Sequence, residues 1–156
     1  MLETRLATIA DAALISSHRR AMFEAMGRGT AESLDAMTRS FEPWVISRLA
    51  DGRYMGWIIS DAASPIASAG LLILEWPPHP LDPAGESRAY LLNVFVEPAY
   101  RRRGLARELV RLCLAEARRR RICIVSLHAS EQGRPVYESL GFRAANEMLF
   151  IDTALG

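Results

Sequence analysis

A short stretch of arginines and small residues, residues 101–106 with the sequence RRRGLA, directly follows an apolar segment that ends at Val96. Apolar residues recur at helical spacing from Leu105 onward, so an amphipathic helix is predicted to begin near Gly104. A helix amino terminus carries unpaired N–H groups and the positive end of the helix dipole, and it therefore attracts anions. Gly104 and the small Ala106 let the backbone approach such an anion closely. The turn is predicted to cradle a diphosphate.

Two other interpretations fit the arginines taken alone: a solvated helix start and a nucleic-acid patch. Nucleic-acid phosphates attract basic side chains, but no aromatic stacking set accompanies these arginines, and the formal net charge of the chain is only +1. Nucleic acid is therefore not an expected partner. The second basic run, residues 118–121, is expected to complement the dipole at the far end of the same helix. Contact with a ligand phosphate there is the lesser alternative.

The elements before this turn follow from the hydrophobic periodicity. Residues 3–8 fit a short strand, and Asp11 can cap a helix that runs to about Met26 and stops at Gly27. A second helical stretch follows Thr30, and Pro43 is expected to kink it or divide it into two short helices.

The period then changes to that of strands. Residues 54–59 and 66–74 predict an antiparallel hairpin, and the proline-rich residues 76–87 predict a loop. Residues 89–96 and 122–127 are nearly continuous apolar runs, as expected of strands buried on both faces of a sheet. A shorter helix before Gly141 and a last strand at 148–151 complete the chain. The fold class is therefore α+β, an α/β sandwich with a mixed central sheet and helices on both faces.

The composition fits one globular domain over residues 1–156, with 50% hydrophobic and 24% charged residues. No signal peptide is evident, and the longest apolar run is too short to span a bilayer, so a cytoplasmic protein with no membrane partner is expected. Cys113 and Cys123 stand in apolar runs and are predicted to be small buried hydrophobes. The sequence suggests no metal site.

Together these segments resemble the GNAT superfamily of N-acetyltransferases. The pattern Arg/Gln-x-x-Gly-x-Gly/Ala is matched by Arg101, Gly104 and Ala106. It is preceded by Val96-x-Pro98 and followed, after the next predicted strand, by the sequence YESLGF at 137–142. The motifs cover about the last 70 residues, and the amino-terminal half matches mainly in the order of its elements.

The resemblance implies direct transfer of an acetyl group from acetyl-CoA to a primary amine in a ternary complex. In this family two central strands splay apart and expose a strand edge to the pantetheine arm of the cofactor. Here those strands would be 89–96 and 122–127, with a backbone N–H near Val94 polarising the thioester carbonyl. The cofactor-binding residues that the resemblance implies are Val94, Phe95, Val96, Arg101, Arg102, Arg103, Gly104, Leu105, Ala106 and Ser130.

Tyr137 matches the tyrosine of the family that donates a proton to the departing thiolate, and it is the predicted catalytic residue. A tyrosine that only packs its helix on the sheet is the alternative. Ser130 stands where the family often has an asparagine that contacts the cofactor, and it could instead cap the helix before which it lies. A family glutamate that acts as base in some members falls near Tyr90, where this chain has no carboxylate.

The base and the acceptor therefore stay open. Candidate bases are Glu75, His79, Glu86, Asn93 through a water, and His128, and deprotonation through water without a dedicated base is equally consistent with the sequence. Arg19 and Arg20 would favour an anionic acceptor, within a range that extends from small-molecule to peptide amines. A non-catalytic acyl-CoA-binding regulatory module of the same fold is the alternative function, and the resemblance makes a homodimer possible.

Overall fold

The computed structural model describes residues 1–155, so the last residue of the predicted 1–156 domain lies outside the described part. A single sheet has the strand order β1-β2-β3-β4-β5. Its strands are β1 Leu2–Leu6, β2 Tyr54–Asp61, β3 Ser64–Glu75, β4 Ser87–Val96 and β5 Val125–Ser126. The helices are α1 Ala12–Ala25, α2 Ala31–Asp51, α3 Leu105–Arg119 and α4 Arg134–Ser139, with short 3-10 turns at Ile9–Asp11 and Pro98–Tyr100.

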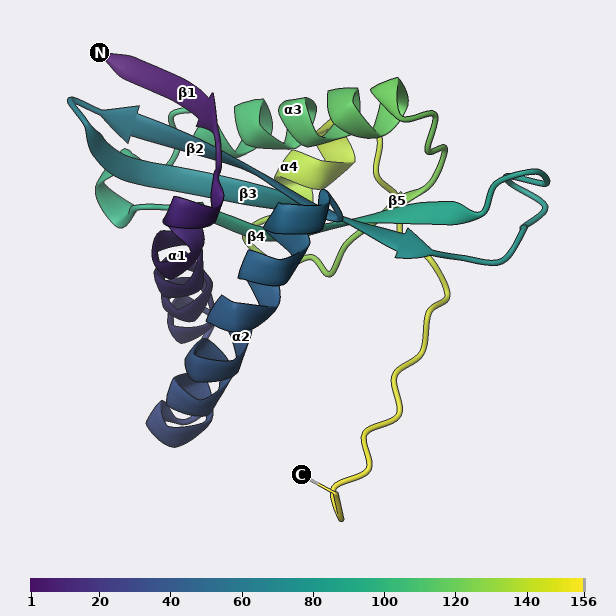
Figure 1. Cartoon of the computed structure of the whole chain (residues 1–156), viewed down its shortest axis with the longest axis horizontal. Helices are drawn as coiled ribbons and strands as arrows, with labels where there is room; N and C mark the ends of the chain where they lie inside the picture. The colour runs from purple at the N-terminus through teal and green to yellow at the C-terminus, as the bar shows by residue number, and fades with distance from the viewer. Residues whose placement is uncertain (156) are drawn as a thin grey trace.

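The sheet separates two helical layers (Figure 1): α1 and α2 lie on one face, and α3 and α4 lie on the other. Neighbouring strands from β1 to β4 are antiparallel, and β4 pairs with β5 in parallel. The larger apolar core lies between the sheet and α3, where Leu109, Val110 and Cys113 are fully buried. A smaller core joins α1 and α2 to the sheet around Ile15 and Val45. The predicted α+β class with a mixed sheet is confirmed.

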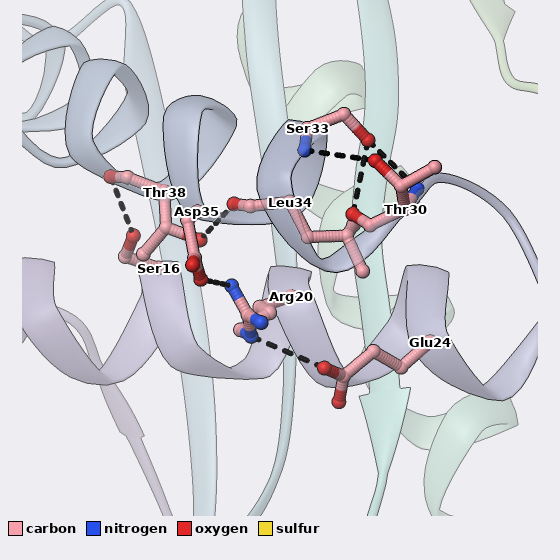
Figure 2. A network of polar contacts seen from close by, with 8 residues as sticks. All are labelled: Ser16, Arg20, Glu24, Thr30, Ser33, Leu34, Asp35 and Thr38. Carbon is pink, nitrogen blue, oxygen red and sulfur yellow. Dashed lines mark hydrogen bonds and ion pairs between the residues drawn. The ribbon is translucent and has the colours of Figure 1, made fainter.

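The helix pair α1 and α2 is fixed by polar contacts along its seam (Figure 2). Ser16 Oγ donates to the carbonyl of Thr38 at 3.3 Å, and Arg20 is ion-paired with both Glu24 and Asp35. At its amino end, α2 is capped by Thr30, whose hydroxyl accepts from the Ser33 amide at 3.1 Å. The prediction that Pro43 could divide α2 was wrong: one helix of 21 residues runs through it. The lost N–H leaves a gap in the hydrogen-bond ladder that flanking turns tolerate.

The predicted hairpin of β2 and β3 is confirmed, and its turn is tight. Only Ala62 and Ala63 separate the two strands, with φ of 45° and 70°. Two central residues with positive φ match the right-handed twist of the flanking strands. The long predicted loop then follows β3, and β4 begins where that loop ends at Ser87.

A bulge interrupts β4 at Asn93. The β3–β4 register steps from Ser68↔Phe95 to Gly70↔Leu92, so two residues of β4 stand opposite one residue of β3. Asn93 has a φ of 56°, in the left-handed region that asparagine tolerates better than most residues. Gly70 is needed beside this bulge, because a Cβ there would lie 2.0 Å from the phenol oxygen of Tyr54. The phenol crosses β3 at that point and reaches Asn93.

The carboxyl-terminal part differs most from the prediction. The expected strand 122–127 is reduced to the two residues of β5, which are half-buried. The expected strand at 148–151 was wrong: these residues have no regular structure, and the chain after α4 runs away from the body (Figure 1). Apolar runs favour burial and β structure, but they do not fix which partner supplies it. Cys113 is buried as predicted, whereas Cys123 is exposed, because the strand that was expected to enclose it is not formed.

Candidate functional site

The parallel strands β4 and β5 separate soon after they meet. Their pairing is confined to Ala89↔Val125 and Tyr90↔Ser126. From Leu91 onward, β4 has no β5 neighbour among the residues that the structure describes. On its other edge β4 remains paired with β3 as far as Val96. The carboxyl-terminal half of β4 therefore presents one open edge, at the gap that the family resemblance implied between these two strands.

The turn before α3 lies just beyond this open edge, since only the short turn Pro98–Tyr100 intervenes. Arg102 and Gly104 both adopt positive φ, 63° and 81°. Positive φ at a residue other than glycine is uncommon and occurs preferentially at binding sites. A Cβ built on Gly104 would meet no atom within 4 Å, so the space beside its backbone is open.

The first turn of α3 leaves its amides unsatisfied. The first of its amides with a backbone acceptor is that of Glu108, which donates to the carbonyl of Gly104 at 3.0 Å. No side chain caps this end of the helix. The amides of Leu105, Ala106 and Arg107 are therefore unpaired within residues 1–155, as expected of an anion-binding helix end.

Arginine side chains surround this turn without closing it. Arg101, Arg102 and Arg103 are all exposed. Arg101 Nε donates to the carbonyl of Val96 at 3.1 Å, and the guanidinium of Arg103 lies 5.0 Å from the ring centre of Tyr100. The charge available to a bound diphosphate thus comes from side chains already held beside the helix end.

The second basic run has a different role. Arg119 and Arg120 are ion-paired with Glu116 at the carboxyl end of α3. That end is about 20 Å from Gly104 along the helix axis. The arrangement agrees with the prediction of a basic helix end that complements the dipole.

The predicted strand residues Val94, Phe95 and Val96 lie along the open half of β4. Phe95 and Val96 are opposite Ser68 and Ala67 of β3, while Val94 belongs to the bulge. The side chains of Val94 and Val96 pack toward the α3 core, and Phe95 lies against His18 of α1 with a ring-centre distance of 4.6 Å. The strand is therefore packed on both faces, and this packing fixes the direction of its free edge.

Tyr137 lies on α4 and is half-buried against the α3 core. Its ring meets Phe142 edge to face, with 5.9 Å between ring centres. Burial raises the pKa of Tyr137, so its phenol stays protonated near neutral pH. No hydrogen bond of this phenol occurs within residues 1–155. Arg107 Nη2 donates to Ser139 Oγ at 2.7 Å, a contact that holds α4 beside the first turns of α3.

Ser130 closes the turn that leads into α4, but it is not the cap of that helix, whose N-cap residue is Gly133. Its hydroxyl accepts from the Gly133 amide at 3.0 Å, and its carbonyl accepts from the Arg134 amide at 2.9 Å. Pro135 stands in the first turn of α4, as predicted from its missing N–H. The serine hydroxyl hydrogen is still available for another acceptor.

The candidate bases fall into two groups. Glu75, His79 and Glu86 lie at the hairpin end of β3 and β4, far from the open half of β4. His128 instead lies directly after β5, and its Nδ1 contacts the phenol oxygen of Tyr90 at the point where the two strands separate. Tyr90 stands where the resemblance would place a glutamate, so an aromatic pair occupies this position in place of a carboxylate.

Three comparisons with known proteins bear on this geometry. The model of the acetyltransferase (GNAT) family matches residues 13–142. A crystal structure of a GCN5-related N-acetyltransferase from Ralstonia eutropha JMP134 is 40% identical, with a TM-score of 0.93 over 97% of this chain and 99% of that one. The chain belongs to the GNAT acetyltransferase family. Membership supports an acetyl-transferring enzyme.

Two further relatives extend the likeness of this GNAT protein. A predicted acetyltransferase from Clostridium acetobutylicum, solved with acetyl-CoA, is 26% identical, with a TM-score of 0.90 over 100% of this chain and 99% of that one. A glucosamine 6-phosphate N-acetyltransferase from Trypanosoma brucei brucei is 38% identical over 69 residues. That stretch is 44% of this chain, and it spans only about half of the relative, 46% of its length.

The structure also reveals a polar chain on the α1 face of the bulge that sequence reasoning missed. Arg19 Nη1 donates to Asn93 Oδ1 at 2.7 Å, and Asn93 Nδ2 donates to the phenol oxygen of Tyr54 at 3.0 Å. The guanidinium also stacks over Phe23 and Phe41, with 5.0 Å and 4.9 Å from its carbon to the ring centres. The sequence pointed to His18, Arg19, Arg20 and Phe23 on the acceptor side, and of these Arg20 is neutralised by its ion pairs at the helix seam.

His18 joins α1 to the sheet beside the same bulge. It is 5% exposed, and its Nδ1 lies 2.8 Å from Ser68 Oγ. Burial lowers the pKa of His18 from 6.5 to about 4, so the folded protein holds this imidazole neutral.

Among the described residues, no helix is long and apolar enough to cross a membrane. Residues 1–155 also bring together no group of three acidic, histidine or cysteine side chains that could hold a metal ion.

The His18 environment predicts a pH dependence of stability. Below pH 6.5 the unfolded chain binds a proton at His18, whereas the folded protein binds that proton only near pH 4. The contribution of neutral His18 to the free energy of unfolding is therefore fully present above pH 6.5. It is lost as the pH drops toward 4, by roughly 2 kcal/mol between about pH 7 and pH 5. Urea unfolding of the wild type and of His18→Gln measures this, and the variant is expected to show a flatter dependence. His79→Gln, at an exposed loop residue, should keep the wild-type slope; an equal slope in His18→Gln would contradict the assignment.

Proposed function

We propose that the protein transfers an acetyl group from acetyl-CoA to a primary amine by direct attack within a ternary complex. The observation that carries this proposal is the open edge of β4 beside the unpaired amino end of α3. Both features leave backbone hydrogen-bonding groups without partners in residues 1–155, at the edge of β4 and in the first turn of α3, with only residues 97–104 between them. A ligand with a diphosphate at one end and an amide-bearing arm fits both features.

The residues present fit coenzyme A in its diphosphate part and in its arm. Positive φ at Gly104 and the empty space where its Cβ would stand allow phosphate oxygens to reach the amides of α3. Arg101, Arg102 and Arg103 would add charge, and the free edge from Val94 to Val96 would bind the arm. Bound acetyl-CoA supplies an acetyl group activated as a thioester. The acetyl-CoA in the Clostridium acetobutylicum relative supports this choice of donor.

Tyr137 is the proposed proton donor to the thiolate that leaves. Its phenol is protonated near neutral pH because burial raises its pKa, and it belongs to a helix docked on α3 beside the gap. Ser130, which organises the loop before that helix, retains one hydroxyl hydrogen for the cofactor arm. His128 is the best-placed proton acceptor for the amine, since of the candidate side chains only His128, where β4 and β5 separate, and Asn93, in the open half of β4, lie beside the gap.

The proposed acceptor is an amine that also carries an anionic group. Burial lowers the pKa of Arg19, which means that the surroundings disfavour its charge. No carboxylate within residues 1–155 pairs with it, and its Nε is buried without a hydrogen-bond partner. A desolvated guanidinium without a counter-charge is costly unless a ligand supplies one. The relative named for glucosamine 6-phosphate, a substrate with both an amine and a phosphate, supports this class.

The Tyr137 role predicts a separation of turnover from binding. Tyr137→Phe should lower kcat by roughly 100-fold or more, because the proton donor to sulfur is lost. Its dissociation constant for acetyl-CoA should stay within about twofold, since the phenol makes no contact needed to hold the cofactor's diphosphate at the α3 end. Release of free thiol with a panel of amines measures turnover, and mass spectrometry of the products detects the added acetyl group.

Tyr100→Phe is the matched control, because the Tyr100 phenol donates to Asp61 at 3.0 Å on the far side of the turn. It should keep its turnover. Full activity in Tyr137→Phe would exclude the acid role. Binding of acetyl-CoA without turnover on any amine would favour the regulatory module over the enzyme.

The Arg19 role predicts a selective loss of affinity for the acceptor. Arg19→Gln should raise KM for anionic amines by roughly 10- to 100-fold, the worth of one charge-assisted hydrogen bond. KM for a matched neutral analogue, such as an amino acid amide against the free amino acid, should change little. Arg20→Gln removes an equal charge one residue away, at the ion-paired seam, and should leave both KM values unchanged. A wild type that prefers the neutral member of each pair would contradict the proposal.

A further inference from the structure

Two arginine side chains each bury a nitrogen atom that has no hydrogen-bond partner. Within residues 1–155, Nε of Arg19 and Nε of Arg88 are the only buried side-chain nitrogen or oxygen atoms without one. Buried polar groups are hydrogen-bonded in the large majority of cases, so an exception points to a partner that the folded chain does not itself supply. Arg19 is the proposed partner of the acceptor's anionic group, whereas Arg88 takes no part in the proposed reaction.

Arg88 lies on the same face of the sheet as Arg19. Leu92 of β4 packs against the core beneath α1 and α2, whereas Ala89 belongs to the core beneath α3. Because side chains alternate along a strand, Arg88 and Tyr90 project to the same side as Leu92. Helix α1 brings Arg19 to this side, where its guanidinium lies within electrostatic range of the Tyr90 phenol. The two arginines therefore stand on either side of Tyr90 on one surface.

An aromatic ring holds the side chain of Arg88 in place. Its guanidinium carbon lies 4.2 Å from the centre of the Trp76 ring. Trp76 directly follows β3, and its amide donates to the Glu86 carbonyl at 3.0 Å, which fixes the indole at the base of the proline-rich loop. Stacking uses the face of a guanidinium and leaves N–H groups at its rim for an anion. No carboxylate within residues 1–155, that of Glu86 included, is ion-paired with Arg88.

The position of Arg88 sets the length of a ligand that reaches both guanidinium groups. Arg88 is the second residue of β4, and this end of the β3–β4 hairpin extends beyond α1 and α2 (Figure 1). Asn93, which binds Arg19, lies five residues farther along the strand, a distance of roughly 15 Å. A single amino acid is too short to span it, whereas an extended peptide does so in about five residues.

We infer that the acceptor is an extended acidic peptide that places one carboxylate on Arg19 and a second carboxylate on Arg88. The inference rests on the proposed acetyl transfer and on the proposed role of Arg19. The strand edge at Val94, the Arg19 contact at Asn93 and the Arg88 contact follow one another toward the start of β4. A peptide with its amine at the gap would meet them in that order. Arg88 would determine specificity, and Trp76 would position it without touching the reacting atoms.

A series of synthetic peptides measures the second contact. Lysine-free octapeptides with a free amino terminus carry Asp at the second position, one Glu at the fifth, sixth, seventh or eighth position, and glycine and serine elsewhere. Each has a counterpart with Gln in place of Glu. A parallel series with a blocked amino terminus and one lysine at the first position tests side-chain amines. In the wild type, at least one Glu peptide should have a KM roughly 10-fold or more below that of its Gln counterpart, the effect of one charge-assisted hydrogen bond.

Variants assign that difference to a residue. Arg88→Gln should abolish it by raising KM for the Glu peptide alone, with kcat unchanged, because Arg88 does not touch the reacting atoms. Arg88→Lys keeps the charge and should retain part of the difference, and Trp76→Leu should reduce it. Arg111→Gln is the matched control, since it removes an exposed charge from α3 on the opposite side of the sheet and should leave the difference intact.

Equal KM values for every Glu and Gln pair in the wild type, or an undiminished difference in Arg88→Gln, would overturn the inference. Acetylation of small anionic amines but of no peptide would also overturn it, while acetyl transfer itself would stand. If no amine at all is acetylated, the proposed function fails as well. Fluorescence anisotropy of the labelled Glu peptide, with coenzyme A present, repeats the comparison without turnover. The dissociation constant should rise roughly 10-fold in Arg88→Gln and stay unchanged in Arg111→Gln.

Discussion

The site depends on backbone groups that the chain leaves unpaired. Buried N–H and C=O groups are almost always hydrogen-bonded, and a missing partner costs free energy. Here β4 gives up its β5 neighbour after two residue pairs, and α3 begins with three amides that have no acceptor in residues 1–155. The rest of the fold keeps the open edge of β4 in place. The core beneath α3 packs on one face of the strand, and β3 pairs with its other edge. A long ligand with phosphates and amides would restore the missing pairs.

The bulge at Asn93 turns the same strand toward the other helical layer. Its positive φ lets the Asn93 side chain meet Arg19 of α1 on one side and Tyr54 of β2 on the other. Because Gly70 has no side chain, the Tyr54 phenol can cross β3 to make that contact. The strand thus contributes in two ways. Its free edge suits a cofactor arm, and the bulge at Asn93 binds the guanidinium of Arg19 near the gap between β4 and β5.

Sequence reasoning predicted the features that depend on local signals. The helix start at Gly104, the hairpin, the proline-rich loop and the place of Pro135 in the first turn of α4 all follow from periodicity and from glycine and proline chemistry. What failed depends on pairing across the chain. The apolar run 122–127 forms only a two-residue strand, and the run 148–151 finds no partner on its own body. Side-chain encounters such as Tyr90 with His128, or Arg19 between Phe23 and Phe41, depend on how α1 and the strand ends meet, which residue spacing does not encode.

Backbone amide chemical shifts during a titration with acetyl-CoA test the central claim most directly. If the diphosphate is held at the helix end and the arm along the strand, the amides of residues 102–107 and 91–96 shift together and saturate at one ligand per chain. S-acetylpantetheine, which lacks the diphosphate, should shift the strand amides but not those of the helix end. Saturable binding that leaves residues 102–107 unmoved would contradict the account.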